Sequence, residues 1–209
     1  MNGKPMIVRV LENLLLPQAR YILIGRKEHL DAEDAIVKYI EKNFNAVIIP
    51  INQITEGTAC TVLCANKYIN NGLPLLIANS DQIIDIHVAD FIHDCDKRQL
   101  DGSILTFIDK EQNPKWSFAK IDNLQLVSEV QEKNPISEFA TVGIYLYQQG
   151  RDFVNAAVEM LIDRNRVNNE YYTCPAYNYA IKAGKKIGIY NITIEQMHGL
   201  GTPEDLSAY

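Results

Sequence analysis

The sequence predicts an α/β fold, and three features of its pattern carry this prediction. In the first eighty residues, segments with helical spacing of apolar residues alternate with short apolar segments. The run from Leu75 to Ala78 is apolar at every position, as expected of a strand covered on both faces. In the second half, several strand-like segments are separated by turn-rich stretches, which indicates antiparallel or mixed pairing. The pattern therefore predicts a mixed, mainly parallel sheet flanked by helices, in one domain over residues 1–209.

In the first half of the chain, proline and glycine mark the ends of the predicted elements. Pro5 begins a helix whose apolar residues recur at helical spacing, and Pro17 ends it. A second helix begins at Asp31 or Asp34, and a third follows the turn Glu56-Gly57-Thr58. Because Gly25 and Pro50 each close an apolar run, strands are predicted over residues 21–24, 46–49 and 75–78.

In the second half, strands are expected first and helices later. The predicted strands cover residues 103–108, 118–121, 124–130, 140–147 and 186–190. Helices are predicted over residues 84–95, 151–163 and 173–183. A short closing helix has Thr202 as its N-cap and Pro203 as its first residue.

The composition excludes several classes of protein. Hydrophobic residues make up 47% of the chain and charged residues 22%, which is ordinary for a globular protein. No stretch has the length of a membrane span, and the N-terminus lacks the layout of a signal peptide. The net charge of −6 argues against a nucleic-acid binder, but it is compatible with a small anionic ligand bridged by a metal. Because 4 cysteines in 209 residues do not suggest a disulfide framework, we expect a reducing, cytoplasmic compartment.

Two polar segments beside the predicted strand 75–78 are candidates for ligand binding. Asn79-Ser80-Asp81 places a carboxylate just past the carboxyl end of the strand, where open α/β sheets bind ligands. Glu56-Gly57-Thr58 precedes a helix and offers backbone N–H groups to an anion or to the edge of a nucleobase. A purely structural role fits these residues equally well. Ser80 and Asp81 could cap the next helix, Thr55 or Thr58 could cap theirs, and Gly57 could form a turn.

Two other groups of residues have the spacing of a metal site, and for both we favour a structural role. His87, Asp90, His93 and Asp94 lie on a predicted amphipathic helix, where solvent-facing side chains are the better interpretation. Cys60 and Cys64 lie one helical turn apart among apolar residues, which favours thiols in the core.

Six short motifs follow one another along the chain. They are Asn2-Gly3-Lys4-Pro5-Met6-Ile7, Glu56-Gly57-Thr58-Ala59, Leu76 to Asp81, Glu132-Lys133 (followed by Asn134 before the proline), Thr141-Val142-Gly143-Ile144-Tyr145 and Gly201-Thr202-Pro203-Glu204-Asp205. In this order they resemble the motifs of nucleotidyltransferases that make nucleotide-activated sugars and have the glycosyltransferase-A-like fold. The resemblance is to the branch found in capsule and lipopolysaccharide gene clusters, often labelled glycosyltransferase-family-2-like. The resemblance covers essentially the whole chain and implies a three-layer Rossmann-like fold.

The resemblance also implies roles for individual residues. Asp81 would coordinate Mg²⁺ bridging the phosphates of an NTP, and would be the catalytic carboxylate. The nucleotide would be held by Glu56, Gly57, Thr58, Asn79 and Ser80. The acceptor, a phosphorylated sugar or a similar small molecule, would be bound by Trp116, Ser117, Glu132, Lys133 and Gly143. For Trp116 a half-buried surface position is an equal alternative, and Glu132 and Lys133 could be a solvated charge pair at a strand end.

The sequence departs from the resemblance at two places. Many relatives carry a second metal-binding aspartate at the position of Gly199, which has no side chain to offer. Relatives also begin with a strand, a glycine-rich G-x-G-x-R loop and a P-K-P segment, none of which is present here. That loop stabilises charge on the triphosphate, and the strand is central in the sheet. We therefore expect an N-terminally shortened chain in which two strand edges lack a partner and activity is in doubt.

The resemblance predicts transfer of NMP from an NTP to a phosphorylated sugar, and it leaves two alternatives. The first is a glycosyltransferase of the same fold that uses a nucleotide sugar, which the absence of a D-x-D motif disfavours. The second is a non-catalytic binding subunit, which the missing phosphate loop favours. A homo-oligomer is compatible with the sequence.

Overall fold

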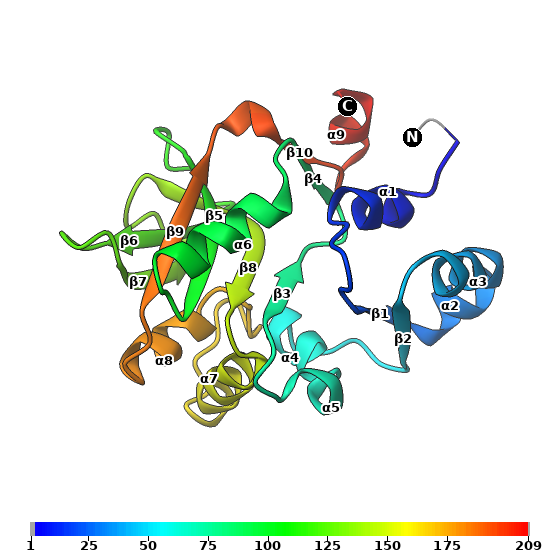
Figure 1. Cartoon of the computed structure of the whole chain (residues 1–209), viewed down its shortest axis with the longest axis horizontal. Helices are drawn as coiled ribbons and strands as arrows, with labels where there is room; N and C mark the ends of the chain where they lie inside the picture. The colour runs from blue at the N-terminus through cyan, green and yellow to red at the C-terminus, as the bar shows by residue number, and fades with distance from the viewer. Residues whose placement is uncertain (1–2, 209) are drawn as a thin grey trace.

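The computed structural model describes residues 3–208 and shows a mixed α/β fold in which helices flank the strands (Figure 1). The predicted α/β fold class, with a mixed sheet flanked by helices, is confirmed. The helices are α1 Met6–Asn13, α2 Lys27–Ala32, α3 Asp34–Asn43, α4 Thr58–Leu63, α5 Asn66–Ile69, α6 Val88–Lys97, α7 Gly150–Ile162, α8 Ala176–Lys182 and α9 Pro203–Ala208, with a 3-10 turn at Ile194–Gln196. The strands are β1 Tyr21–Arg26, β2 Ala46–Ile51, β3 Leu75–Ala78, β4 Gln82–Ile84, β5 Gly102–Ile108, β6 Ser117–Ile121, β7 Val127–Glu132, β8 Phe139–Tyr147, β9 Ile187–Ile192 and β10 Met197–Gly199.

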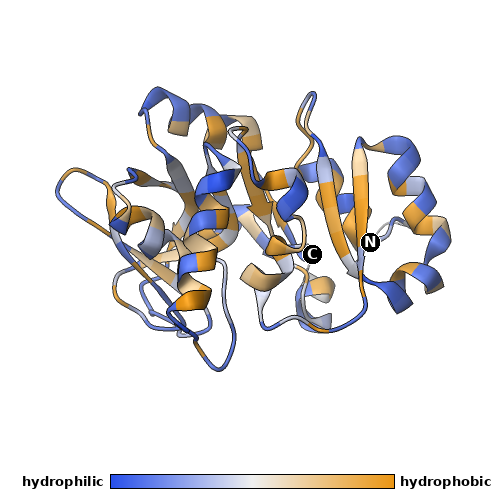
Figure 2. Cartoon of the chain, turned by 90° about the horizontal axis from the view of Figure 1, so that it is seen from below, coloured by the Kyte–Doolittle hydropathy of each residue, from blue (hydrophilic) through white to orange (hydrophobic). Residues whose placement is uncertain are grey.

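The largest sheet is organised around β8. Its strand order is β7-β6-β8-β5-β9, and β3 also pairs with β8. Strands β5 and β9 are parallel, whereas β8 is antiparallel to β3, β5 and β6. Successive side chains of β8 enter two different hydrophobic clusters, with Ile144 and Leu146 in one and Tyr145 and Tyr147 in the other. The sheet is therefore covered on both faces, and Figure 2 shows the apolar residues concentrated on the strands and on the inward faces of the helices.

A smaller sheet contains β1 and β2, which run parallel with Tyr21 opposite Ala46. Helices α2 and α3 lie beside this sheet, forming a lobe on the β3 side of the molecule (Figure 1). On one face its strands pack with Val8 and Leu11 of α1. Within residues 3–208, β1 pairs only with β2, and β3 pairs only with β8. Each of β1 and β3 therefore has one edge without a strand partner.

The segment after Asp81 corrects one prediction. We expected a helix from Ile84 to Cys95, but residues 82–84 form β4 and the helix α6 begins at Val88. Strand β4 pairs with β10, a segment more than a hundred residues away, so tertiary pairing decides the local structure. Ser80 and Asp81 consequently lead into a strand and do not cap a helix. In the described part of the chain, no helix is long and apolar enough to cross a membrane.

Candidate functional site

The turn Glu56-Gly57-Thr58 is held in place by the segment from Glu170 to Thr173. The Tyr171 N–H donates to the Glu56 carbonyl at 2.8 Å, and the Ala59 N–H donates to the Tyr171 carbonyl at 2.9 Å. The Thr173 N–H and hydroxyl each donate to the Thr58 hydroxyl at 3.0 Å. Residues 56–59 and 171–173, far apart in the sequence, are thus joined by hydrogen bonds at the start of α4.

Gly57 is required by this contact. Its φ angle is +119°, and a Cβ at this position would lie 2.5 Å from the Tyr171 carbonyl oxygen and 2.6 Å from the Tyr171 nitrogen. Because both atoms belong to the backbone, no side-chain movement could relieve the clash. The close approach of the Tyr171 backbone is therefore sufficient to explain the glycine, and approach of a nucleobase to Gly57 stays a prediction.

The carboxyl end of β3 lies against a distorted part of β8. The Asn79 N–H donates to the Gly143 carbonyl at 3.2 Å, and the Asn79 side-chain amide donates to Gln82 Oε1 at 3.1 Å. Gly143 has a φ angle of +88° and lies where the pairing between β5 and β8 shifts register, as in a β-bulge. A Cβ at Gly143 would lie 2.3 Å from Asn79 Nδ2. Two side-chain amides therefore occupy the space that the glycine leaves.

Asp81 contacts the turn of residues 199–201. The Leu200 N–H donates to the Asp81 carbonyl at 2.7 Å, and a Cβ at Gly201 would lie 2.8 Å from Asp81 Oδ2. The neighbouring His198 has its Nε2 2.7 Å from Asp85 Oδ2. Within residues 3–208, no group of three or more His, Cys, Asp or Glu side chains could hold a metal ion.

Glu132 and Ser117 face one another across β6 and β7. The two residues are direct partners in the antiparallel register, and the Ser117 hydroxyl donates to Glu132 Oε2. Burial raises the pKa of the Glu132 carboxyl, and nearby Glu170 adds to the shift, while Ser117 and Lys133 oppose it. A half-buried carboxylate that already accepts one hydroxyl is suited to accept further hydroxyl groups from a ligand.

Lys133 extends this group of polar residues beyond the end of β7. Its ammonium donates to the Tyr172 hydroxyl at 2.9 Å and lies 4.8 Å from the centre of the Tyr172 ring. The hydrogen bond to Tyr172 raises the pKa of Lys133. Tyr172 in turn donates to Glu170, which raises the pKa of the phenol. Lys133 is therefore a charged, exposed ammonium held in one place by an aromatic ring and a hydroxyl.

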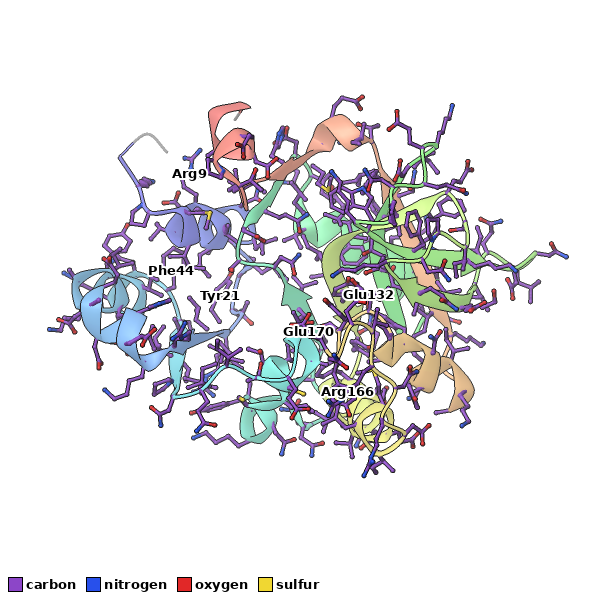
Figure 3. The ribbon with its side chains drawn as sticks, turned by 180° about the vertical axis from the view of Figure 1, so that it is seen from behind. Arg9, Tyr21, Phe44, Glu132, Arg166 and Glu170 are labelled. Atoms are coloured by element: carbon purple, nitrogen blue, oxygen red, sulfur yellow. The ribbon has the colours of Figure 1, made fainter. Side chains whose placement is uncertain are left out.

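The segment 170–173 connects the two groups of residues. Tyr171 and Thr173 bind the turn at residues 56–58, and Tyr172, between them, binds Lys133. Figure 3 shows Glu132, Glu170 and Arg166 in one region of the molecule, with Tyr21 and Phe44 in the smaller lobe. Arg166 forms an ion pair with Glu56, the first residue of the turn. The turn predicted to bind the nucleotide and the predicted acceptor residue Lys133 are thus joined through one segment.

Several residues that contact the predicted site residues were missed by sequence reasoning. Tyr172 binds Lys133 and Glu170, Arg166 binds Glu56, and the buried Gln82 accepts from Asn79, and only contact in the fold reveals them. Trp116 was predicted, and it is half-buried with its ring 5.4 Å from that of Phe107 and Lys115 over its face. Its backbone carbonyl accepts from the N–H of Lys133, a residue predicted to bind the acceptor, at 3.0 Å. Asn2, which opens the first motif, lies outside the described residues.

For the two other groups with the spacing of a metal site, a structural role was predicted, and the structure bears on each group differently. His87, Asp90 and His93 are exposed, as expected of the solvent-facing side of a helix. Cys60 packs partly against the core, but Cys64 is exposed, so the prediction of a core thiol is wrong for Cys64. Cavities of about 730 and 530 Å³ lie elsewhere, beside α7 and α8 and beside the ends of β5 and β9, and neither is lined by a predicted site residue.

Comparison with known proteins finds solved structures with the same fold. The chain is similar in fold to the nucleoside-diphosphate-sugar pyrophosphorylase of Vibrio cholerae RC9, with a TM-score of 0.83, 22% identity, and coverage of 99% of this chain and 87% of that chain. A candidate glucose-1-phosphate thymidylyltransferase of Bacillus anthracis, solved with sucrose, gives a TM-score of 0.72 at 18% identity, covering 98% of this chain and 80% of the other. HddC of Yersinia pseudotuberculosis gives a TM-score of 0.65 at 19% identity, and the match covers 99% of this chain and 84% of that chain.

At these identities the structural matches establish the fold, and the sequence itself establishes the family. No functionally curated protein has significant sequence similarity to the chain. The family model described as nucleotidyl transferase matches residues 1–202. This match spans almost the whole chain, from the first motif to the turn that contacts Asp81. The chain therefore belongs to the nucleotidyl transferase family.

Proposed function

We propose that this protein transfers NMP from an NTP to a phosphorylated sugar or a similar small acceptor, in the synthesis of capsule or other surface polysaccharide. One observation carries the proposal: the segment 170–173 binds the predicted nucleotide turn with Tyr171 and Thr173 and the predicted acceptor residue Lys133 with Tyr172. Similarity to a nucleoside-diphosphate-sugar pyrophosphorylase supports the class of acceptor. The four free cysteines support a cytoplasmic location.

The proposed roles follow the chemistry of each side chain. The base binds at Glu56, Gly57 and Thr58, and the rest of the nucleotide contacts Asn79 and Ser80. Glu132 accepts hydrogen bonds from hydroxyl groups of the phosphorylated substrate, and Ser117 donates to them. Lys133 binds the phosphate of the same substrate as a point charge. Gly143 and Trp116 shape the acceptor pocket.

We propose Mg²⁺ as the cofactor, with Asp81 as its protein ligand. The Asp81 carboxylate fits this role because the glycine at position 201 leaves it room against the 199–201 turn. Mg²⁺ in nucleotide sites is commonly held by one or two carboxylates together with phosphates and water. When bound, the ion neutralises charge on the phosphates of the NTP.

The reaction is an in-line displacement at phosphorus. A phosphate oxygen of the acceptor forms a bond to the α-phosphorus, the bond from that phosphorus to the oxygen bridging to the β-phosphate breaks, and pyrophosphate leaves. The acceptor phosphate is already anionic at neutral pH, so no side chain must remove a proton from it. Lys133 positions the attacking phosphate and offsets its charge, and Glu132 orients the acceptor through its hydroxyls.

Pyrophosphate release tests the proposal. The four NTPs are each combined with a panel of sugar 1-phosphates and other phosphorylated small molecules in the presence of Mg²⁺. We expect one NTP and one class of acceptor to release pyrophosphate, and Asp81→Asn to reduce the rate by about a thousandfold or more. Release of free NDP from a nucleotide sugar would instead establish the glycosyltransferase alternative. Acceptor binding without turnover in any combination would establish the binding-subunit alternative.

We also propose that the active protein carries one more strand, between β1 and β3, with the phosphate-binding loop at its end. Support comes from the edges of these two strands, which have no strand partner within residues 3–208. Support also comes from their side chains, since apolar β1 and β3 residues such as Ile24 and Ile77 are only partly buried. Mass spectrometry of the protein from its native source tests this. We expect a mass larger than that of residues 1–209, and a mass equal to it would contradict the proposal.

A further inference from the structure

Lys133 has a backbone conformation that few residues other than glycine adopt. Its φ angle is +54°, in the left-handed region, and its N–H donates to the Trp116 carbonyl at 3.0 Å. Such a conformation persists only where the surrounding structure fixes it. The backbone therefore fixes the direction in which the Lys133 side chain leaves the end of β7, and the ammonium meets the Tyr172 hydroxyl at 2.9 Å.

Two carboxylates lie near the Lys133 ammonium. The hydrogen bond with Tyr172 raises the pKa of Lys133 most, and the negative charges of Glu132 and Glu170 raise it further. Both carboxylates therefore attract the ammonium. Within residues 3–208, however, Lys133 forms no ion pair with either of them.

Tyr172 lies between Lys133 and Glu170. Its hydroxyl accepts from the Lys133 ammonium and donates to the Glu170 carboxylate. The Glu132 carboxylate is likewise bonded by a neutral hydroxyl, that of Ser117. Each carboxylate thus has a neutral partner, and the ammonium contacts an oxygen that carries no charge.

The backbone on both sides of Tyr172 is held by hydrogen bonds to another segment. The Tyr171 N–H donates to the Glu56 carbonyl at 2.8 Å, and the Thr173 N–H donates to the Thr58 hydroxyl at 3.0 Å. The Tyr172 ring lies 4.8 Å from the lysine ammonium, a contact that attracts the cation and leaves its charge in place. Tyr172 is therefore anchored where its hydroxyl separates the two opposite charges.

We propose that Tyr172 is a positioning residue that keeps the Lys133 ammonium out of an ion pair with Glu170, and so available to the phosphate group of a small ligand. This inference rests on the proposed function, which assigns the acceptor phosphate to Lys133. A phosphate that approaches the ammonium then meets a charge that no carboxylate in contact has neutralised, and it displaces at most one neutral hydroxyl.

The experiment measures how well inorganic phosphate protects Lys133 from acetylation by a trace of acetic anhydride, with peptide mass spectrometry of each lysine. In the wild-type protein, phosphate should protect Lys133 and leave Lys67 unprotected. Tyr172→Phe keeps the ring but removes the hydroxyl, so Glu170 can pair with Lys133. The phosphate concentration that gives half protection of Lys133 should then rise about threefold or more.

Tyr68→Phe is the matched control. Tyr68 is half-buried like Tyr172, and the Lys67 ammonium lies 4.8 Å from the centre of its ring. Removing this hydroxyl should leave half protection of Lys133 within about twofold of the wild-type concentration.

A second variant separates the proposed role from a role in shape alone. In Tyr172→Phe/Glu170→Gln the carboxylate that competes for Lys133 is gone, although the tyrosine hydroxyl is still missing. Half protection of Lys133 should therefore return to within about twofold of the wild-type concentration. Melting temperatures of all variants establish that each is folded.

The outcomes also separate this inference from the proposed function. Wild-type protection in Tyr172→Phe would overturn the role of Tyr172, as would a loss that persists in Tyr172→Phe/Glu170→Gln. Absence of protection of Lys133 in the wild-type protein would overturn it too. Pyrophosphate release by the wild-type protein in any of these cases would leave the proposed function standing. Protection, loss and rescue as expected, without pyrophosphate release from any NTP, would contradict nucleotidyl transfer and leave the phosphate site at Lys133 standing.

Discussion

Burial raises the pKa of the Glu132 carboxyl, and this couples the proposed acceptor site to stability. A carboxyl group whose pKa is higher in the folded than in the unfolded protein favours folding when it is protonated. That contribution is fully present below the unfolded pKa and is lost as the pH rises through the folded pKa. Above its folded pKa, Glu132 is therefore a charged carboxylate in a site that penalises the charge. Such a cost is typical of residues kept for binding.

Glu132→Gln should raise stability at neutral pH and leave it unchanged in acid. The amide keeps an acceptor for the Ser117 hydroxyl and carries no charge to bury. Melting temperatures of the variant and the wild type are compared from pH 4 to pH 8, with the exposed Glu111→Gln as the control. A difference that stays constant over this range would contradict the assigned cause.

Gly57→Ala should destabilise the protein more than Gly184→Ala. Both glycines have φ angles in the left-handed region, +119° and +84°. The alanine at position 184 meets open space, so it costs only about 1–2 kcal/mol for the backbone conformation. At position 57 the Cβ also meets the Tyr171 backbone, which adds about 1–3 kcal/mol. Urea unfolding measures the free energy of unfolding of both variants. Equal losses of this free energy would refute the claim that a Cβ at position 57 clashes with the Tyr171 backbone.

At the scale of residues, sequence motifs located the charged groups but not their partners. Asp81, Glu132 and Lys133 were named from short motifs. The structure shows Glu132 bonded to Ser117 and Lys133 bonded to Tyr172, and it places the Asp81 carboxylate beside Gly201. Tyr172 was missed because it lies 39 residues from Lys133 and forms no motif with it.

At the scale of elements, the segment 170–173 depends on the Thr58 hydroxyl. Thr58→Val keeps the shape of the side chain but removes the acceptor of both bonds from Thr173. Because Thr173 is only 5% exposed, its unpaired N–H should cost about 1–3 kcal/mol of unfolding free energy. Thr58→Ser keeps the hydroxyl and should cost little. The two variants are compared by chemical denaturation, and similar values would show that the hydroxyl does not hold the segment.

The elements that were predicted correctly are those whose sequence patterns are local. Strand β3 has the predicted bounds because a continuous apolar run lies between Pro74 and Asn79. Strands β4 and β10 were missed because each has three residues and exists only through pairing with the other. The first half of the chain showed an alternation of helices and strands, but the sequence did not indicate that β3 would pair with β8.

At the scale of the whole molecule, the two sheets should differ in local stability. Strands β5 and β8 are buried and bonded on both sides, whereas β1 and β3 each have an open edge and partly exposed side chains. Amides of β1 and β3 should therefore exchange with deuterium roughly 100-fold faster than those of β5 and β8. Hydrogen exchange followed by mass spectrometry measures this. Equal protection of the amides of all four strands from exchange, measured on residues 1–209, would contradict the claim that β1 and β3 each have an unpaired edge.

Calorimetric titration with each of the four NTPs, with and without Mg²⁺, tests the central claim of nucleotidyl transfer most directly. We predict that the protein binds one NTP, that binding requires Mg²⁺, and that Asp81→Asn abolishes it while the variant stays folded. This outcome would identify the base and place the metal at the end of β3. Absence of binding for every NTP by the folded native protein, in the presence of Mg²⁺, would contradict the claim.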